Sequence, residues 1–197
     1  MTKTVSAGRP SKASQRLSKQ LILRTALPIV QEHGVDALSF RVLADKLSVT
    51  PMAITYHSGS KQQLLADLID IAFAGISKTT TEQDPAERAR SILRNYCTSA
   101  LKNANLLRAM LEDGSLLNDE LAKMVAELKA NTQQLANSDD GDVLVHLLID
   151  YTHGFVLAAA ADENNPLTID DFLRGIDWVL SQATGAKERT DHDKHQN

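Results

Sequence analysis

The segment SFRVLADKLSVTPMAITYHSGSKQQLL, residues 39–65, decides the fold of this chain. Ser39 carries a hydroxyl suited to capping a helix, and the residues that follow place apolar side chains on one helical face: Leu43, Ala44 and Leu47. Ser48 and Val49 then form a tight turn. The segment therefore begins with a short helix that ends in a turn.

A second helix starts at Thr50 and Pro51, because a hydroxyl caps it and proline occupies the first helical position, which needs no amide donor. Only Ile54 is a firm apolar anchor in this helix. The other side chains are left to face outward: Met52, Ala53, Thr55, Tyr56 and His57. A short helix with one firm core residue, placed after a helix and a turn, is typical of a helix-turn-helix that enters the major groove of DNA.

The chain resembles the N-terminal domain of the TetR family of bacterial transcriptional repressors. The likeness extends from about Ile22 to Leu68 and rests on ILRTALPIVQEHGVDAL, SFRVLADKLSVTP, the Tyr56-His57 pair, and Lys61 with Leu64-Leu65. The sequence departs from the family at three positions: Pro28 lies inside the first helix, Ser48 replaces the usual turn glycine, and Ser58 replaces an aromatic or aliphatic residue.

Composition indicates an all-α protein. The 197 residues are 43% hydrophobic and include only five prolines and nine glycines, and no alternating Val/Ile/Thr runs suggest strands. The resemblance implies about nine helices, three for DNA and six behind them. We predict a disordered basic arm over 1–15, a helix-turn-helix domain over 16–66, a helical regulatory and dimerisation domain over 67–184, and a disordered tail over 185–197.

Apolar periodicity and helix start and stop signals predict the helices around this segment. The first spans 18–33, and another runs from Ser60 to near Ser77. The body is expected to contain helices over 85–103, 106–112, 118–136, 142–161 and 168–183, with a loop at 138–141. Val125 is expected on the inward side of the helix over 118–136.

Charge is distributed unevenly along the chain. Residues 1–70 carry nine Lys and Arg against five Asp and Glu, whereas residues 71–197 carry twelve against twenty. A basic end joined to an acidic body is typical of a DNA-binding protein whose body stays away from the phosphates. Arg9, Lys12 and Arg16 can reach a neighbouring groove; the alternative is a solubilising tail.

The single cysteine, Cys97, rules out an intrachain disulfide and favours a reducing compartment. The N-terminus lacks the hydrophobic run of a secretory signal. His146, Asp150 and His153 interrupt the most apolar stretch, which argues against a membrane span. We therefore expect a cytoplasmic protein.

The resemblance implies that Arg41 contacts guanine; a single phosphate contact is the alternative. Met52, Ala53 and Thr55 are expected at base edges, mostly through apolar groups. Tyr56, His57 and Lys61 are expected on phosphates, although Tyr56 can also pack beneath the helix. The predicted DNA-binding set is Ser39, Arg41, Thr50, Pro51, Met52, Ala53, Thr55, Tyr56, His57 and Lys61.

Dimerisation is expected because one recognition helix reads few base pairs and two-fold symmetry doubles the contacts. A stripe of small residues led by an aromatic marks the helix over 142–161: Tyr151, Gly154, Ala158 and Ala161. The resemblance implies a four-helix interface that also includes the last helix, with Phe172 and Ile176. Packing within one chain is the alternative.

A small-molecule effector is expected between the helix that starts at Ser60 and the helices behind it. Its pocket would be lined by residues such as Tyr96, Met110, Met124 and Phe155. Binding there would tilt the connecting helix and lower affinity for the operator through a population shift.

Three smaller patterns have alternative interpretations. His146, Asp150 and His153 share a helical face and match a two-histidine, one-carboxylate metal site, or else a polar rim, which we favour. The acidic residues over 139–142 lack calcium-loop spacing. Cys97 is interpreted as a core residue rather than a redox sensor. We predict neither metal nor cofactor.

We predict a dimeric, sequence-specific DNA-binding protein of palindromic operators that is released by an unidentified effector; that it represses rather than activates is what the resemblance implies. One alternative is a helix-turn-helix regulator without an effector, controlled by a protein partner or by abundance. The other is an all-α enzyme or carrier. We find no activated nucleophile, paired inward carboxylates or phosphate loop, and predict no enzymatic activity.

Overall fold

The computed structural model describes residues 17–77, 82–136, 138–161 and 167–194, with side chains described except at 138–141 and 185–194. The predicted basic arm over 1–15 lies outside these residues. Within the described ranges the chain forms nine α-helices and two short 3-10 helices and no strand, which confirms the all-α prediction.

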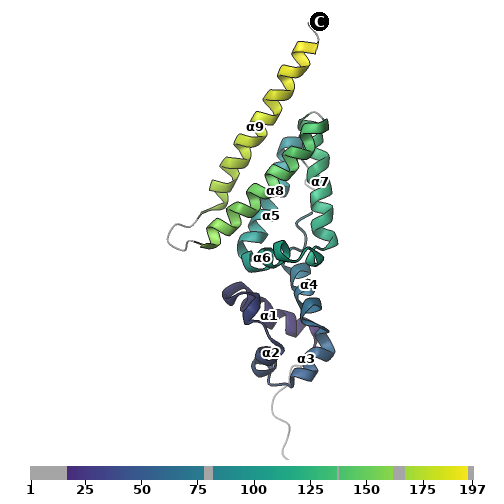
Figure 1. Ribbon diagram of the computed structural model, residues 1–197, viewed down its shortest axis with the longest axis vertical. Helices are drawn as coiled ribbons and strands as arrows, with labels where there is room; N and C mark the ends of the chain where they lie inside the picture. The colour runs from purple at the N-terminus through teal and green to yellow at the C-terminus, as the bar shows by residue number, and fades with distance from the viewer. Residues whose placement is uncertain (1–16, 78–81, 137, 162–166, 195–197) are drawn as a thin grey trace, which may run out of the picture.

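The helices divide between two ends of an elongated molecule (Figure 1). The lower end contains α1 (Lys19–His33), η1 (Val35–Ala37), α2 (Phe40–Leu47) and α3 (Pro51–Ser58), and α4 (Lys61–Ala72) leads from it into the body. The body contains α5 (Pro85–Lys102), α6 (Ala104–Glu112), η2 (Gly114–Leu116), α7 (Asp119–Leu135), α8 (Ser138–Ala161) and α9 (Ile169–Lys194).

Hydroxyl caps begin the first four helices as the sequence predicts. The side-chain oxygens of Ser18, Ser39, Thr50 and Ser60 each accept a hydrogen bond from the backbone amide three residues later, at 3.1 to 3.2 Å. Each cap satisfies an amide that has no partner inside its helix. The start of each of these four α-helices is therefore encoded by a residue directly before it.

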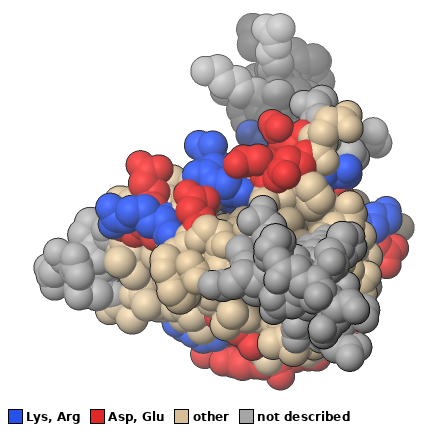
Figure 2. Space-filling view, turned by 90° about the horizontal axis from the view of Figure 1, so that it is seen from above, with Lys and Arg blue, Asp and Glu red and all other residues tan. Residues whose placement is uncertain are grey.

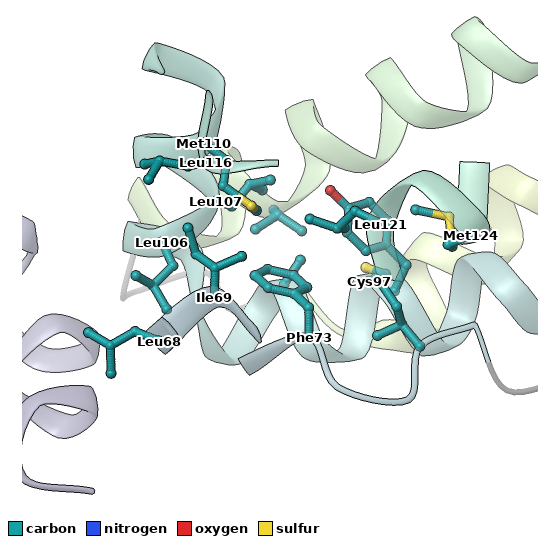
Figure 3. Close-up of a cluster of buried hydrophobic side chains, with 14 of the residues drawn as sticks. Leu68, Ile69, Phe73, Cys97, Leu106, Leu107, Met110, Leu116, Leu121 and Met124 are labelled. Atoms are coloured by element: carbon teal, nitrogen blue, oxygen red, sulfur yellow. The ribbon is translucent and has the colours of Figure 1, made fainter. Parts of the chain in front are cut away.

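One apolar core runs through both ends of the molecule. In the lower end it is built from side chains that are at most 1% exposed: Ile22, Ala26, Val30, Leu38, Leu43, Ile54, Leu64 and Leu68. It continues into the body through the end of α4, where Ile69 and Phe73 lie among side chains of α5, α6 and α7 (Figure 3). The helix that emerges from the lower end therefore shares its packing with the body.

The helix that begins after Ser60 is shorter than predicted, because α4 ends at Ala72 rather than near Ser77. Gly75 adopts a positive φ of 77°, and the chain turns so that Phe73 and Ile76 are buried, at 0% and 2% exposure. The amide of Ser77 donates to Glu120 Oε1 at 3.2 Å. Burying two large side chains here is worth more than extending the helix.

Three other predictions in the body are wrong. Residues 138–141 were expected to form a loop but start α8. α9 continues to Lys194, through most of the stretch expected to be a disordered tail. Val125, expected to face inward, is 37% exposed, while Asn131 and Thr132 are buried on α7 instead.

Helix α8 packs against α5, α6, α7 and α9. Its residues Asp142–Ala161 are also long and apolar enough to cross a membrane, judged by length and composition alone. Part of that apolar surface is exposed: Val143 is 66% and Leu147 is 51% exposed. The helix thus has one face in the bundle and one apolar face that the described residues leave exposed.

Candidate nucleic-acid interface

Helix α3 is held to the protein by two buried residues, Ile54 at 0% and Ser58 at 2% exposure. Met52 and Tyr56 on the other face are 77% and 85% exposed. Met52 and Tyr56 lie about one helical turn apart, so their side chains are neighbours on this exposed face. The structure thus places α3 at the tip of the molecule with most of its side chains available for contact (Figure 1).

The turn before α3 contains an unusual backbone conformation. Ser48 has φ 55° and ψ 44°, and it is the one described non-glycine residue with a positive φ. The amide of Val49 donates to the carbonyl of Ala44 at 3.0 Å, which closes the end of α2. This conformation favours glycine, because glycine has no Cβ. A serine here is therefore a departure from the glycine that is usual in the family.

Ser58, the other departure in this segment, has a local role. Its hydroxyl donates to the carbonyl of Ile54 at 2.9 Å, so its polar group is satisfied inside the core. A small side chain at this position fits a buried site at the end of α3. Pro28, the third departure, lies within a helix that continues to His33.

The polar groups on the outward face of α3 are few. The Thr55 hydroxyl donates to the carbonyl of Pro51 at 3.1 Å, so its hydrogen stays within the helix. Tyr56 and His57 meet edge to face, with ring centroids 5.2 Å apart. His57 is half-buried, whereas Met52 and Thr55 are exposed.

Two exposed basic residues flank α3. Arg41 lies in the first turn of α2, and Lys61 is the first residue of α4. The N-terminus of a helix attracts an anion because its amides are unpaired and its dipole is positive there. Lys61 and the start of α4 can therefore address one phosphate together. The remaining predicted members of this surface, Ser39, Thr50 and Pro51, are also exposed, and Ala53 is half-buried.

The lower end is attached to the body through a group of amide side chains. Asn105 Nδ2 donates to the carbonyls of Val30 at 3.0 Å and Gln31 at 3.2 Å, near the last turn of α1. Gln31 Nε2 donates to Asn103 Oδ1 at 2.9 Å, and Asn103 Nδ2 donates to the carbonyl of Ser99 at 2.8 Å. We call these residues the α1–α6 clamp.

The clamp was missed by sequence reasoning. Gln31 lies more than seventy residues before Asn103 and Asn105 in the sequence. No local pattern connects an asparagine in one helix to a carbonyl in another. Within the lower end, Lys19 Nζ lies 2.7 Å from Asp67 Oδ2 and joins α1 to α4. Both helices that meet the body are thus fixed to their surroundings by polar contacts.

Three of the four residues proposed for an effector pocket lie inside the core. Tyr96, Met110 and Met124 are 3%, 4% and 1% exposed. Figure 3 shows Met110 and Met124 on opposite sides of the cluster that contains Phe73 and Cys97. Phe155 is half-buried and lies 5.3 Å from the Phe172 ring.

Grooves between described residues lie elsewhere. One of about 550 Å³ lies between α4 and the start of α7 and is lined by residues such as Asp70, Leu117 and Glu120. Tyr96, Met110 and Met124 are instead buried in the core. An effector at the predicted position would therefore have to displace core side chains.

The core cluster contains one polar pair. Tyr96 Oη and His153 Nε2 are 2.9 Å apart, and the Tyr96 ring lies 6.0 Å from that of Phe73. Burial raises the pKa of Tyr96 and lowers the pKa of His153, in each case because the charged form is desolvated. Both groups are therefore neutral at pH 7. The pair connects α8 through α5 to the end of α4.

Cys97 fits its interpretation as a core residue, whereas the three polar residues of α8 do not form one polar rim. Cys97 is fully buried, and burial raises the pKa of its thiol to about 12. His146 and Asp150 are exposed, whereas His153 points inward to Tyr96. Among the described residues, no three His, Cys, Asp or Glu side chains are grouped to hold a metal ion.

The residues predicted at a dimer interface divide into two sets. Gly154, Ala158 and Ala161 are exposed on α8, and a Cβ at Gly154 would meet nothing within 4 Å. Phe172 and Ile176 are fully buried within the protomer, so their assignment to an interface is wrong.

Tyr151, also predicted at the interface, packs within the chain. Its ring stacks on Phe172 at 5.5 Å. It also covers Gly175 so closely that a Cβ there would lie 2.2 Å from the Tyr151 hydroxyl. The stripe was interpreted from one helix, and the position of α9 determined which of its residues are covered. On α9, Trp178 is 66% exposed.

The end of the molecule opposite α3 has a mixed charge pattern. Figure 2, which views the molecule from that end, shows groups of Asp and Glu beside groups of Lys and Arg, with uncharged surface between them. Such a surface has no single-sign field to attract DNA. The exposed basic residues of the predicted DNA-binding set, Arg41 and Lys61, lie on α2 and at the start of α4.

The chain is similar to known regulators in sequence. The family model described as "Bacterial regulatory proteins, tetR family" matches residues 22–68, which contain α2, α3 and most of α1 and α4. The class C tetracycline repressor protein of Escherichia coli is 25% identical over 178 residues, which cover 86% of this chain and 76% of the repressor.

Solved structures share the fold. BioQ from Mycobacterium smegmatis gives a TM-score of 0.68 at 23% identity, over 86% of this chain and 99% of that one. BioQ has also been solved with its double-stranded DNA operator. ActR of Streptomyces coelicolor in complex with (S)-DNPA gives a TM-score of 0.66 at 18% identity, over 86% of this chain and 98% of that one.

Proposed function

Because the chain belongs to the TetR family of bacterial regulatory proteins, we propose that it is a dimeric transcriptional repressor that binds a palindromic operator and is released by a small-molecule effector. The observation that carries the proposal is α3, whose outward side chains are exposed while Ile54 and Ser58 alone are buried. A helix held in this way is suited to the major groove, where an α-helix fits.

The predicted contacts fall into two groups on this surface. Arg41, Met52, Ala53 and Thr55 are assigned to base edges, and Tyr56, His57 and Lys61 to phosphates. Phosphate contacts fix the register of the protein on DNA, and base contacts supply specificity. The two sets of residues lie on neighbouring elements that share one core, so both can act on one stretch of duplex.

We assign dimerisation to the exposed face of α8. Val143 and Leu147 expose apolar side chains there, and Gly154, Ala158 and Ala161 continue the same face with small residues. Small residues permit close approach of a second helix, and burial of the apolar side chains stabilises the contact. This face replaces the predicted one that included Phe172 and Ile176.

An effector would act at the junction of α4 with the body. Phe73, at the end of α4, contacts Tyr96 in the core cluster, so a ligand that separates these rings moves the end of α4. ActR, of the same fold, is solved with the small molecule (S)-DNPA, which favours a ligand-responsive body in this chain too. The second candidate is a regulator without an effector, and the burial of Tyr96, Met110 and Met124 in the packed cluster favours it.

The first experiment is selection of DNA from a random library by the full chain, followed by binding to the best site across a salt series. We expect a palindromic site and a steep loss of affinity with salt, because phosphate contacts release counterions. Lys61→Ala should reduce the salt slope, while Lys102→Ala, an exposed change in the body, should not. Absence of an enriched site would contradict the proposal.

A ligand screen then separates the two modes of control. Release of the selected duplex by a small molecule, measured by fluorescence anisotropy, supports an effector. A screen in which no compound changes duplex affinity favours control by a protein partner or by abundance.

A further inference from the structure

The chemistry of α3 limits how it can read DNA. Residues 51–58, PMAITYHS, include no Arg, Lys, Asn, Gln, Asp or Glu. Bidentate recognition of guanine or adenine needs a side chain with two neighbouring donors or acceptors, as in arginine, asparagine or glutamine. Neither a tyrosine hydroxyl nor one histidine nitrogen supplies two. The recognition helix therefore cannot form the paired hydrogen bonds that identify a purine.

The structure further limits which side-chain groups of α3 can contact a base. The hydroxyl hydrogen of Thr55 is donated within the helix to the carbonyl of Pro51, so the side chain offers a base its γ-methyl group and an acceptor oxygen but no donor. Met52 is 77% exposed and ends in a methyl group on a flexible thioether. His57 is half-buried, and its ring lies perpendicular to that of Tyr56. Apolar atoms thus dominate the part of α3 that faces outward.

The one base feature in the major groove that is apolar is the C5-methyl group of thymine. We propose that α3 reads its operator through thymine methyl groups, with Met52 and Thr55 as the specificity-determining residues. Paired hydrogen bonds to a guanine would then come from outside α3, from the exposed Arg41 on α2. This inference rests on the proposed function and names the chemistry that the same surface recognises.

The test uses the full chain and the duplex selected from the random library. At each thymine of one half-site, four versions are compared: thymine, uracil, cytosine and 5-methylcytosine, each with its complementary base. Loss of a contacted methyl group is expected to weaken binding about three- to fivefold. The ratio should be similar for thymine against uracil and for 5-methylcytosine against cytosine, because each pair differs by the methyl group alone.

Two pairs of variants assign the contacts. Thr55→Ser keeps the hydroxyl and removes the γ-methyl group, whereas Thr55→Val keeps a methyl and removes the hydroxyl. We expect Thr55→Ser, and not Thr55→Val, to bring the thymine-to-uracil ratio to about one at a single position. Met52→Ala should do the same at a different thymine, and Met52→Leu should preserve it.

The outcomes distinguish a failure of the proposed function from a failure of thymine methyl readout. If no sequence is enriched, the proposed function itself fails. If a site is enriched but uracil binds as well as thymine at every position, methyl readout is overturned while DNA binding stands. Methyl dependence that neither Thr55→Ser nor Met52→Ala changes would overturn the assignment to α3. Thermal unfolding of each variant confirms that it is folded.

Discussion

Ser48 lies in the left-handed region at the end of α2, with φ 55°. An L-residue there carries a cost of about 1–2 kcal/mol from the contact of its Cβ with the backbone, and glycine avoids it. Glycine also gains freedom in the unfolded chain, which cancels part of the benefit. The turn that positions α3 is thus formed with some strain.

Ser48→Gly should therefore raise the free energy of unfolding by about 0.5–1 kcal/mol. The measurement is the midpoint of urea denaturation for the full chain. Ser115→Gly, at an exposed residue of η2, is the control and should show no such gain. A lower midpoint for Ser48→Gly would contradict the account of this turn.

Cys97 is fully buried, and its pKa is raised from 9.0 to about 12 by desolvation of the thiolate. We expect the native protein not to react with a thiol reagent at pH 8, because the thiolate is the nucleophile and is scarce. Denaturant should restore full reactivity. Rapid stoichiometric labelling of the native chain would show that the site is open.

The same shift of the Cys97 pKa has a consequence for stability. The unfolded thiol ionises near pH 9, while the folded thiol stays neutral. The free energy of unfolding is therefore not affected by this thiol below pH 9. It falls as the pH rises from 9 towards 12, because the unfolded chain then loses the thiol proton more readily than the folded chain.

At the scale of elements, contacts between helices determine whether a glycine is replaceable. Gly154→Ala and Gly175→Ala make the same change in two helices, and alanine favours a helix by about 1 kcal/mol over glycine. A Cβ at Gly175 would lie 2.6 Å from Tyr151 Cζ, whereas one at Gly154 would have no atom of the described residues outside its own helical turn within 4 Å. The contact of α8 with α9 at Tyr151 therefore depends on Gly175.

We expect Gly175→Ala to lower the thermal midpoint despite its better helix propensity, because the Tyr151 ring must leave its place on Phe172. Near-ultraviolet circular dichroism should change with it. Combining Gly175→Ala with Tyr151→Phe should recover part of the loss, since the contacting hydroxyl is removed. A higher midpoint for Gly175→Ala alone would disagree with this packing.

The α1–α6 clamp joins the reading end to the body at the same scale. Asn105→Ala removes two hydrogen bonds to α1 carbonyls and should lower the free energy of unfolding by about 1–2 kcal/mol. It should also change affinity for the selected duplex, because the orientation of α1 sets that of α3. Lys102→Ala, nearby and exposed, is the control. Equal denaturation midpoints for the two variants would show that the clamp contributes nothing.

At the scale of the whole molecule, the exposed face of α8 determines the assembly. Gly154→Leu adds a side chain that the protomer itself accommodates, since nothing lies within 4 Å of its Cβ. If two copies meet at this face, leucine should separate them and weaken binding to a palindrome far more than to a half-site.

Sedimentation velocity measures the expected shift of Gly154→Leu from dimer to monomer. Thr98→Leu, on the exposed side of α5, is the matched control and should stay dimeric. A Gly154→Leu protein that remains dimeric would place the interface elsewhere on the chain.

The sequence by itself determined the helix-turn-helix and the exposure of most side chains of its second helix. The caps at Ser18, Ser39, Thr50 and Ser60 act over three residues, and Ile54 is the apolar anchor that the pattern identifies. These signals are local, because a hydroxyl caps the helix that directly follows it and apolar periodicity belongs to one helix. They also matched a family pattern, which identified the domain before the fold was known.

Only the tertiary structure decided which faces are covered. Phe172 and Ile176 are buried inside the protomer, α4 ends where Phe73 and Ile76 enter the body core, and Asn105 reaches carbonyls of α1. An apolar residue can be buried against its own chain or against a partner, and its hydrophobicity is the same in both cases. The choice depends on which helix lies opposite, and that is a property of the assembled bundle.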